Sequence, residues 1–145
     1  IDAAIDYKAA NMSEVIPELC PEGIDVIFDN VGGEFLDTAL TNINQSARIA
    51  ICGAISGYNN ETPAPGPSNY TALIIQRARM EGFIVLDYMD RFPEAIAELM
   101  QWVQEGKIIY QEDIQEGIEN APETLLRLYT GKNKGKQLLK ISDPD

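Results

Sequence analysis

Two short apolar runs separated by one helix-length segment constrain the fold of this chain most strongly. The first run covers residues 24–28, and the second covers residues 47–52 and opens into a loop of small residues that ends at Tyr58. Continuous apolar runs rich in β-branched residues are typical of buried strands in parallel sheets. Apolar residues recur at helical spacing from Phe35 to Ile43, which predicts a crossover helix between the strands. The pattern therefore predicts a βαβ unit and an α/β fold.

Helices and strands continue to alternate on both sides of this unit. Asn11 is placed to cap a short helix over residues 11–19, and the proline-rich stretch 59–69 predicts an extended surface loop. A helix over residues 70–78 leads into a third buried strand, which we expect at residues 82–86. The three strands would belong to one sheet.

The last third of the chain follows a different pattern. Asp90 is placed to cap a strong amphipathic helix that ends at Gly106. Beyond Gly106 the sequence predicts a short strand at residues 108–110, a helix over 120–130 and a final strand at 136–141. This change favours a small separate unit after Gly106.

The composition limits the possible partners. The 145 residues have a formal net charge of −12, which argues against binding to nucleic acid or anionic membranes, because both need clustered Lys and Arg. With two cysteines and no histidine, neither a disulfide framework nor a metal site is supported. No apolar run reaches the roughly 18 residues that span a bilayer. We therefore expect a cytoplasmic protein whose partners are small molecules or other proteins.

The carboxyl ends of the predicted strands are the expected ligand site. Parallel strands bind ligands at this edge, so Asn30 and the loop from Gly53 to Tyr58 should lie side by side. The Tyr58 phenol could donate a proton or hydrogen bond to an oxyanion, although a packed or surface tyrosine is the simpler interpretation. Asp29 is interpreted as a solvated turn carboxylate rather than a general base, and Cys52 as a small buried residue rather than a nucleophile.

A dinucleotide-binding fingerprint does not occur in the sequence. No G-x-G-x-x-G follows a strand, and there is no P-loop. Gly32-Gly33 opens a helix after a strand, where a tight turn is favoured over an anion site. The chain also begins at Ile1 without Met. We therefore expect a fragment of a longer protein, in which a phosphate-binding loop would precede Ile1.

Five motifs in a fixed order connect the sequence to a known family. They are Ile5-Asp6-Tyr7-Lys8, Phe28-Asp29-Asn30-Val31-Gly32-Gly33, Cys52-Gly53-Ala54-Ile55-Ser56-Gly57-Tyr58-Asn59, Arg77-Ala78-Arg79-Met80-Glu81-Gly82-Phe83 and Gly131-Lys132-Asn133-Lys134-Gly135-Lys136. In this order they resemble the zinc-independent medium-chain dehydrogenase/reductases. The most similar subgroup is the NADPH-dependent alkenal double-bond reductases, also known as prostaglandin or curcumin reductases. The resemblance covers nearly the whole chain.

The resemblance implies an architecture in two parts. In that family a GroES-like catalytic domain comes mostly from the N-terminal half, a Rossmann domain follows, and a C-terminal segment returns to the catalytic domain. By this analogy residues 1–105 are the distal part of a Rossmann-type, NADP-binding parallel sheet, and residues 106–145 are the returning segment. The analogy also implies a homodimer through the strand expected at 82–86 or its neighbour, since an exposed apolar edge strand favours association.

The resemblance further implies NADP as cofactor and assigns residues to it. Tyr7 would lie against the adenosine end, Asn30 would contact the cofactor at its strand end, and Asn133 would reach the nicotinamide from the returning segment. The loop that lines the nicotinamide ribose would consist of Cys52, Gly53, Ala54, Ile55, Ser56, Gly57 and Tyr58. The nicotinamide itself would be flanked by Phe83, Ile84 and Val85.

The implied reaction passes a hydride from NADPH to the β-carbon of an α,β-unsaturated aldehyde or ketone, without a metal. Charge then builds on the carbonyl oxygen as an enolate. Tyr58 would be the catalytic residue, stabilising that oxygen together with the ribose hydroxyl and relaying a proton. Residues 1–145 alone are expected to be inactive, because a pyrophosphate-binding turn is not among them.

Two other functions stay open at this stage. An S-adenosylmethionine-dependent methyltransferase also has a Rossmann-like sheet in which an acidic residue or Asn ends a strand, as Asp29-Asn30 does. The ordered motifs after residue 50 weigh against it. The second alternative is a non-catalytic dinucleotide-binding or assembly module.

Overall fold

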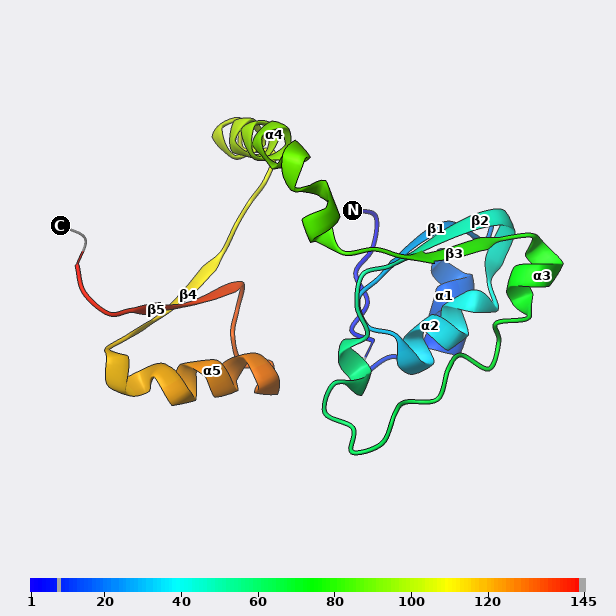
Figure 1. The fold of residues 1–145 in the computed structure, drawn as a ribbon, viewed down its shortest axis with the longest axis horizontal. Coiled ribbons are helices and arrows are strands. Elements are labelled where there is room, and N and C mark those ends of the chain that lie inside the picture. Colours follow the sequence, from blue (N-terminus) through cyan, green and yellow to red (C-terminus); the bar gives the residue numbers. More distant parts are fainter. Residues whose placement is uncertain (8, 144–145) are drawn as a thin grey trace. The chain divides into compact units, whose positions relative to one another are not determined.

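The computed structural model describes residues 1–7 and 9–143 (Figure 1). Lys8, the last residue of the motif Ile5-Asp6-Tyr7-Lys8, lies outside the described residues, as do residues 144–145. The chain forms two compact units, Ile1–Met89 and Asp90–Asp145, and each has its own parallel sheet. The units divide before the helix at residues 92–104, whereas the expected domain boundary lies after it. The assignment of residues 1–105 to one domain stays a prediction.

The first unit is built on the predicted βαβ pattern. Its sheet contains β1 (Ile24–Asp29), β2 (Ile43–Ile51) and β3 (Arg79–Gly82), all parallel and in the order β1-β2-β3. The helix α2 (Gly33–Leu40) connects β1 to β2 as predicted. The strand β2 begins earlier than expected, with an irregular register opposite β1 and a positive φ of 64° at Ser46.

Apolar residues of α2, β2 and α1 (Met12–Leu19) form the core of this unit. Leu40, Ala47 and Ile49 are at most 2% exposed. Asn11 caps α1 as predicted, since its side-chain oxygen accepts a hydrogen bond from the Ser13 N–H at 3.2 Å. Figure 1 shows α1 and α2 on one side of the three strands. The core therefore lies between these helices and that face of the sheet.

The two faces of β1 have different surroundings. Ile27 and Asp29 are buried towards the helices, whereas Val26 and Phe28 are more than half exposed on the opposite face. Successive side chains of a strand point to opposite faces, which accounts for this alternation. The apolar run that predicted a strand buried on both faces is therefore covered on one face only, within the described residues.

The prediction of a strand at residues 82–86 is wrong. The structure has β3 at Arg79–Gly82, followed by the 3-10 turns η2 at Val85–Arg91. Pairing ends at Gly82 because its partner on β2, Ile51, is the last residue of that strand, and Phe83 adds one more hydrogen bond to the Ile51 carbonyl at 3.1 Å. The apolar run thus follows the strand instead of forming it, and Ile84, the first residue past Phe83, is 63% exposed.

The connection between β2 and β3 is mostly loop, as predicted. The helix within it, α3 (Ala72–Gln76), is shorter than the expected 70–78. The Asp37 carboxylate on α2 holds the end of the proline-rich loop, because it accepts hydrogen bonds from Ser68 Oγ at 2.5 Å and the Asn69 N–H at 2.7 Å. These bonds lower the pKa of Asp37 below its ordinary value.

The second unit contains two helices and a two-stranded parallel sheet. Its elements are α4 (Phe92–Gln104), β4 (Glu112–Glu116), the 3-10 turn η3 (Ile118–Asn120), α5 (Ala121–Thr130) and β5 (Lys136–Lys140). Helix α5 and strand β5 agree with the prediction. Pro93 lies in the first turn of α4, but Arg91 is the N-cap residue and the cap has no side-chain hydrogen bond, so the expected Asp90 cap is wrong.

The prediction of a strand at residues 108–110 is also wrong. The strand β4 begins four residues later, at Glu112–Glu116, and Ile114 pairs with Leu138 of β5. The apolar pattern did not predict β4, because its inward-facing residues, Asp113 and Gln115, are polar and form a hydrogen-bond network.

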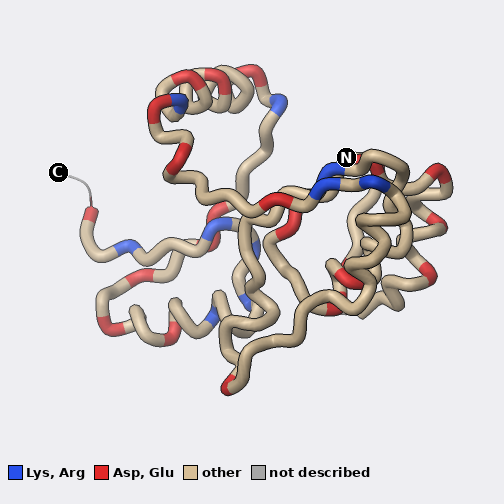
Figure 2. Tube along the Cα trace, turned by 45° about the vertical axis from the view of Figure 1, so that its right-hand side comes forward, with Lys and Arg blue, Asp and Glu red and all other residues tan. Residues whose placement is uncertain are grey.

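Figure 2 shows acidic residues spread along both units. No helix among residues 1–7 and 9–143 is long and apolar enough to cross a membrane.

Candidate functional site

The carboxyl ends of the three strands of the first unit meet at one edge of the sheet. Asp29 is paired with Ile51, and Ile51 with Gly82, so the residues that follow each strand leave the sheet at the same level. Asn30, Cys52 and Phe83 occupy these positions. The parallel register therefore brings together three segments, of which the first and the last are 53 residues apart in the sequence, as predicted for the ligand edge of an α/β sheet.

Asp29 organises the turn that follows β1. Its carboxylate accepts hydrogen bonds from the Val31 N–H at 2.9 Å and from the Gly32 N–H at 3.0 and 3.1 Å, and the residue is 1% exposed. The interpretation of Asp29 as a solvated carboxylate is therefore wrong. A buried carboxylate is stable only when its oxygens are hydrogen-bonded, and the turn supplies those donors. The Gly32 N–H is used inside the turn, which supports the tight-turn interpretation of Gly32-Gly33.

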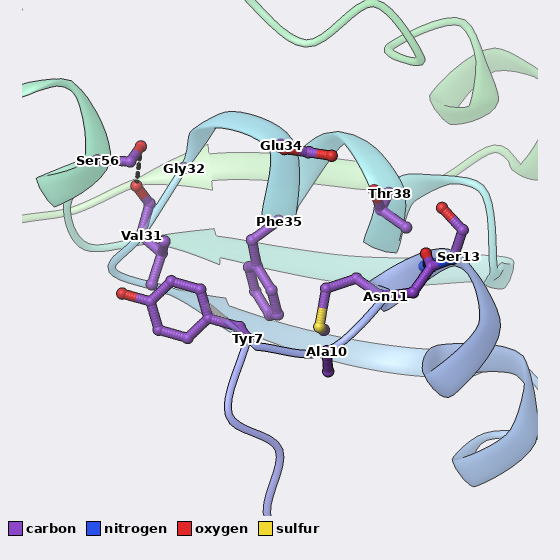
Figure 3. Close-up of a pocket in the computed structure, with 11 residues that line it drawn as sticks. Tyr7, Ala10, Asn11, Ser13, Val31, Gly32, Glu34, Phe35, Thr38 and Ser56 are labelled. Carbon is purple, nitrogen blue, oxygen red and sulfur yellow. Dashed lines mark hydrogen bonds between the residues drawn. The ribbon is translucent and has the colours of Figure 1, made fainter.

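The loop after β2 is hydrogen-bonded to this turn. The Asp29 carbonyl accepts the Cys52 N–H at 2.8 Å, and the Asn30 carbonyl accepts the Ile55 N–H at 3.1 Å. The Val31 carbonyl accepts both the N–H and the Oγ–H of Ser56, at 3.1 and 2.6 Å (Figure 3). One set of hydrogen bonds to the carbonyls of residues 29–31 therefore fixes the predicted Asn30 and residues 52–58 relative to each other.

Most of the residues predicted to hold the nicotinamide line one open hollow of about 530 Å³ at this edge. The predicted residues that line it are Cys52, Gly53, Ala54, Tyr58, Phe83 and Ile84. Ile51, Gly82 and Asp87 line it as well and were not predicted. Asp87 was not predicted because a strand over 82–86 would extend the chain and place residue 87 far from the hollow. In the structure the Asp87 N–H bonds the Ile84 carbonyl at 3.0 Å, and this turn brings Asp87 back to the hollow.

Tyr58 lies over the start of its own loop. The 3-10 turn η1 (Ile55–Gly57) reverses the chain, so that the Tyr58 hydroxyl accepts a hydrogen bond from the Ala54 N–H at 3.5 Å. The tyrosine is 69% exposed, so its phenol can reach a ligand in the hollow. Cys52 is exposed too, which corrects its interpretation as a buried residue, because it lies just beyond the end of β2.

Phe83 is held by two other aromatic rings. Its ring makes edge-to-face contacts with Phe28 (centroids 5.7 Å apart) and Tyr88 (6.0 Å apart). Ile84 follows it at the hollow, whereas Val85, the third residue predicted to flank a nicotinamide, begins the η2 turns and is not among the residues that line the hollow.

Tyr7 lines a second hollow, of about 440 Å³, in the same unit. Figure 3 shows the Tyr7 ring beside Val31 and Phe35, with Glu34, Thr38 and Ser13 further along the hollow. Tyr7 and Phe35 pack edge to face with centroids 6.3 Å apart. Ser56 also lines this hollow, so the loop 52–58 borders both hollows.

Asn133 belongs to the second unit, and its own loop satisfies part of its side chain. The Asn133 Nδ2 donates to the Gly135 carbonyl at 2.8 Å. The loop is held by Asp113, whose carboxylate accepts the Lys134 N–H at 3.0 Å and the Arg127 Nη2 at 2.6 Å. These bonds, with the Lys134 N–H as the largest contribution, lower the pKa of Asp113 below its ordinary value of 3.8.

Residues 1–7 and 9–143 contain no group of three or more His, Cys, Asp or Glu side chains arranged to hold a metal ion.

Sequence comparisons relate the chain to reductases. The family described as zinc-binding dehydrogenase matches residues 1–105. The NADPH-dependent curcumin reductase of Escherichia coli is 41% identical over 149 residues, which cover 99% of this chain and 43% of that protein. The NADP(+)-dependent 2-alkenal reductase of Nicotiana tabacum is 42% identical over 142 residues, covering 97% of this chain and 41% of that protein.

The structure comparison agrees with the fold. CurA from Vibrio vulnificus, solved in complex with NADPH, matches 99% of this chain and 44% of its own length, with a TM-score of 0.86 and 40% identity. This match confirms the predicted fold class, a Rossmann-type parallel sheet. The chain spans less than half the length of these relatives.

The depressed pKa of Asp113 predicts an acid sensitivity of the loop that holds Asn133. A carboxylate whose pKa is lowered by folding stabilises the protein above its unfolded pKa of about 3.9, and this contribution is lost as the pH falls through the folded value. Urea unfolding should therefore show a stability difference between the unchanged protein and Asp113→Asn that is constant above about pH 5 and narrows below about pH 4. Glu112→Gln, at an exposed carboxylate of the same strand, is the control. A difference independent of pH would contradict the prediction.

Proposed function

The chain belongs to the zinc-binding dehydrogenase family, and on this basis we propose that the protein reduces the carbon–carbon double bond of α,β-unsaturated aldehydes and ketones with NADPH. The main support is geometric. Cys52 and Tyr58 from the loop after β2, and Phe83 from the segment after β3, line one hollow at the carboxyl edge of a parallel sheet. The names of the curcumin and alkenal reductases, each above 40% identical, support the substrate class.

The residues around the hollow fit a nicotinamide nucleotide. The ring would lie against Phe83, Ile84 and Val85, of which the first two line the hollow. The loop of residues 52–58 would line the ribose, where glycines leave the backbone open to close approach. Bound NADPH supplies a hydride equivalent, and the cavity of about 530 Å³ is within the range of small-molecule sites.

Three further residues would hold the rest of the cofactor. Asn30 leaves β1 beside the loop and would bond the nucleotide at the strand end. Tyr7, in the second hollow, would lie against the adenosine end, and Asn133 would reach the nicotinamide from its loop. We also propose that residues 1–105 act as the NADP-binding part and residues 106–145 as the segment that returns to a catalytic domain.

Tyr58 would perform the polar part of the reaction. When the β-carbon of an enone accepts a hydride, negative charge collects on the carbonyl oxygen. The phenol is a hydrogen-bond donor and its side chain is 69% exposed at the hollow, so it can bond that oxygen and pass on a proton. The Ala54 N–H bonds the phenol oxygen, which leaves the phenol hydrogen free to point towards the substrate.

Zinc has no role in this proposal. The family name refers to zinc, but the described residues do not provide a ligand cluster. No step here requires a metal on this chain, and we propose a zinc-independent reaction. The cytoplasmic location expected from the sequence stays a prediction.

The products of an enal distinguish this proposal from carbonyl reduction. The complete gene product, given NADPH and crotonaldehyde, should form butanal, because the hydride adds at the β-carbon and the phenol stabilises the resulting enolate oxygen until protonation at the α-carbon gives the saturated aldehyde. Gas chromatography would identify the product. Crotyl alcohol as the main product would contradict the proposal.

Replacing Tyr58 with Phe should lower kcat more than it raises the KM for the enone. The lost hydrogen bond matters most when the oxygen is charged, and loss of such a donor costs on the order of 10²-fold in kcat. Tyr70→Phe, at an exposed tyrosine outside the hollow, is the matched control. If Tyr58→Phe keeps the full kcat, Tyr58 has a packing role only.

Residues 1–145 on their own should bind NADPH weakly and show no turnover. Hydrogen bonds from Asn30, Tyr58 and Asn133 are worth roughly 0.5–1.5 kcal/mol each, which does not offset the ordering of a flexible cofactor. Isothermal titration of this chain is the measurement. A micromolar dissociation constant would contradict the prediction.

We also propose a homodimer. The exposed apolar residues just after β3, including Ile84, Val85 and Leu86, are 53–63% exposed, and contiguous apolar surface of this kind marks interaction sites. Because β3 and η2 take the place of the strand predicted at 82–86, the contact would use the edge of β3 and these residues. Light scattering of the complete gene product should give twice the monomer mass, and a monomer at micromolar concentration would contradict this.

A further inference from the structure

The Tyr58 hydroxyl lies close to where a side chain on residue 53 would begin. A Cβ built on Gly53 would be 3.2 Å from Tyr58 Oη and 3.4 Å from the Asn30 carbonyl oxygen. The first distance is shorter than a Cβ atom normally keeps from a neighbour. A side chain on residue 53 would therefore need the phenol oxygen to move away by a few tenths of an ångström.

The backbone at this position does not itself require glycine. Gly32 and Gly33, in the facing turn, have φ values of +66° and +57°, which residues other than glycine rarely adopt. Gly53 is not among the positive-φ glycines. Its requirement for glycine comes from the space that the phenol fills and not from its backbone conformation.

We infer that Gly53 is a positioning residue that determines where the Tyr58 hydroxyl lies in the hollow. This inference rests on the function proposed above. A methyl group at residue 53 would lie close to the Tyr58 hydroxyl and the Asn30 carbonyl, and these two groups differ in how easily they can move. The Asn30 carbonyl is bonded to the Ile55 N–H at 3.1 Å, whereas the Tyr58 side chain is largely exposed. The phenol is therefore the group that moves.

A small movement is enough to detach the phenol. The Ala54 N–H lies 3.5 Å from Tyr58 Oη, which is the limit of a hydrogen bond, so a shift of a few tenths of an ångström removes it. The phenol would then be displaced towards the open hollow and would no longer have its hydrogen directed by an amide donor. Catalytic geometry must be held within about 0.5 Å, and a 1 Å error can cost about 10²-fold in rate.

The test is Gly53→Ala in the complete gene product, with NADPH and crotonaldehyde. We expect kcat to fall about tenfold, which is the intermediate cost of a displacement below 1 Å, even when NADPH is saturating. Gly66→Ala is the control, because a Cβ there meets no atom within 4 Å. The double variant Gly53→Ala/Tyr58→Phe should be no slower than Tyr58→Phe alone, since Gly53 acts only through the phenol.

Crystal structures of Gly53→Ala and Gly66→Ala distinguish a failure of the role inferred for Gly53 from a failure of the catalytic role proposed for Tyr58. A displaced phenol in the first variant together with the loss of kcat supports the inference. An unmoved phenol overturns the inference alone, as does a multiplicative loss of kcat in the double variant. A displaced phenol with full kcat, like an active Tyr58→Phe, overturns the catalytic role proposed for Tyr58 and with it this inference.

Discussion

Asp29 ends β1 as a buried carboxylate, and the geometry of the candidate site depends on how its polar atoms are satisfied. Its side chain accepts hydrogen bonds from Val31 and Gly32, and its carbonyl accepts the N–H groups of Cys52 and Gly53 at 2.8 and 3.3 Å. A charged group with 1% exposure needs such donors, because an unpaired buried carboxylate is strongly destabilising. One residue therefore determines the path of the chain after two neighbouring strands.

The loop of residues 52–58 transmits this order to the ligand edge. Main-chain bonds to Asn30 and Val31 hold its middle, and the η1 turn brings Tyr58 back over Gly53. Ser56 faces the hollow that contains Tyr7, and Tyr58 faces the hollow that contains Phe83. A single seven-residue segment thus contributes to both hollows, and in the function proposed above it would contact two parts of an elongated cofactor.

The second unit holds its candidate residue in a comparable way. Asn133 lies in a loop between α5 and β5, and the part-buried Asp113–Arg127 ion pair bonds that loop from β4 and α5. Gln137 links the two groups further, accepting from Arg127 Nε at 2.9 Å and donating to the Asp113 carbonyl at 2.7 Å. In both units, therefore, an aspartate with little exposure orders the loop that contains a predicted cofactor ligand.

The sequence by itself determined the βαβ unit, the helices α1, α2 and α5 and the loop after β2, because apolar periodicity and capping residues are local properties of the chain. Ordered motifs also identified the family. The tertiary structure alone decided that β3 ends at Gly82 and that β4 contains Asp113, because strand limits depend on where the partner strand ends and on which polar side chains find buried partners. It alone placed Asp87 at the hollow and the Tyr58 hydroxyl against Gly53. These contacts depend on turns whose direction is set by hydrogen bonds between segments distant in sequence.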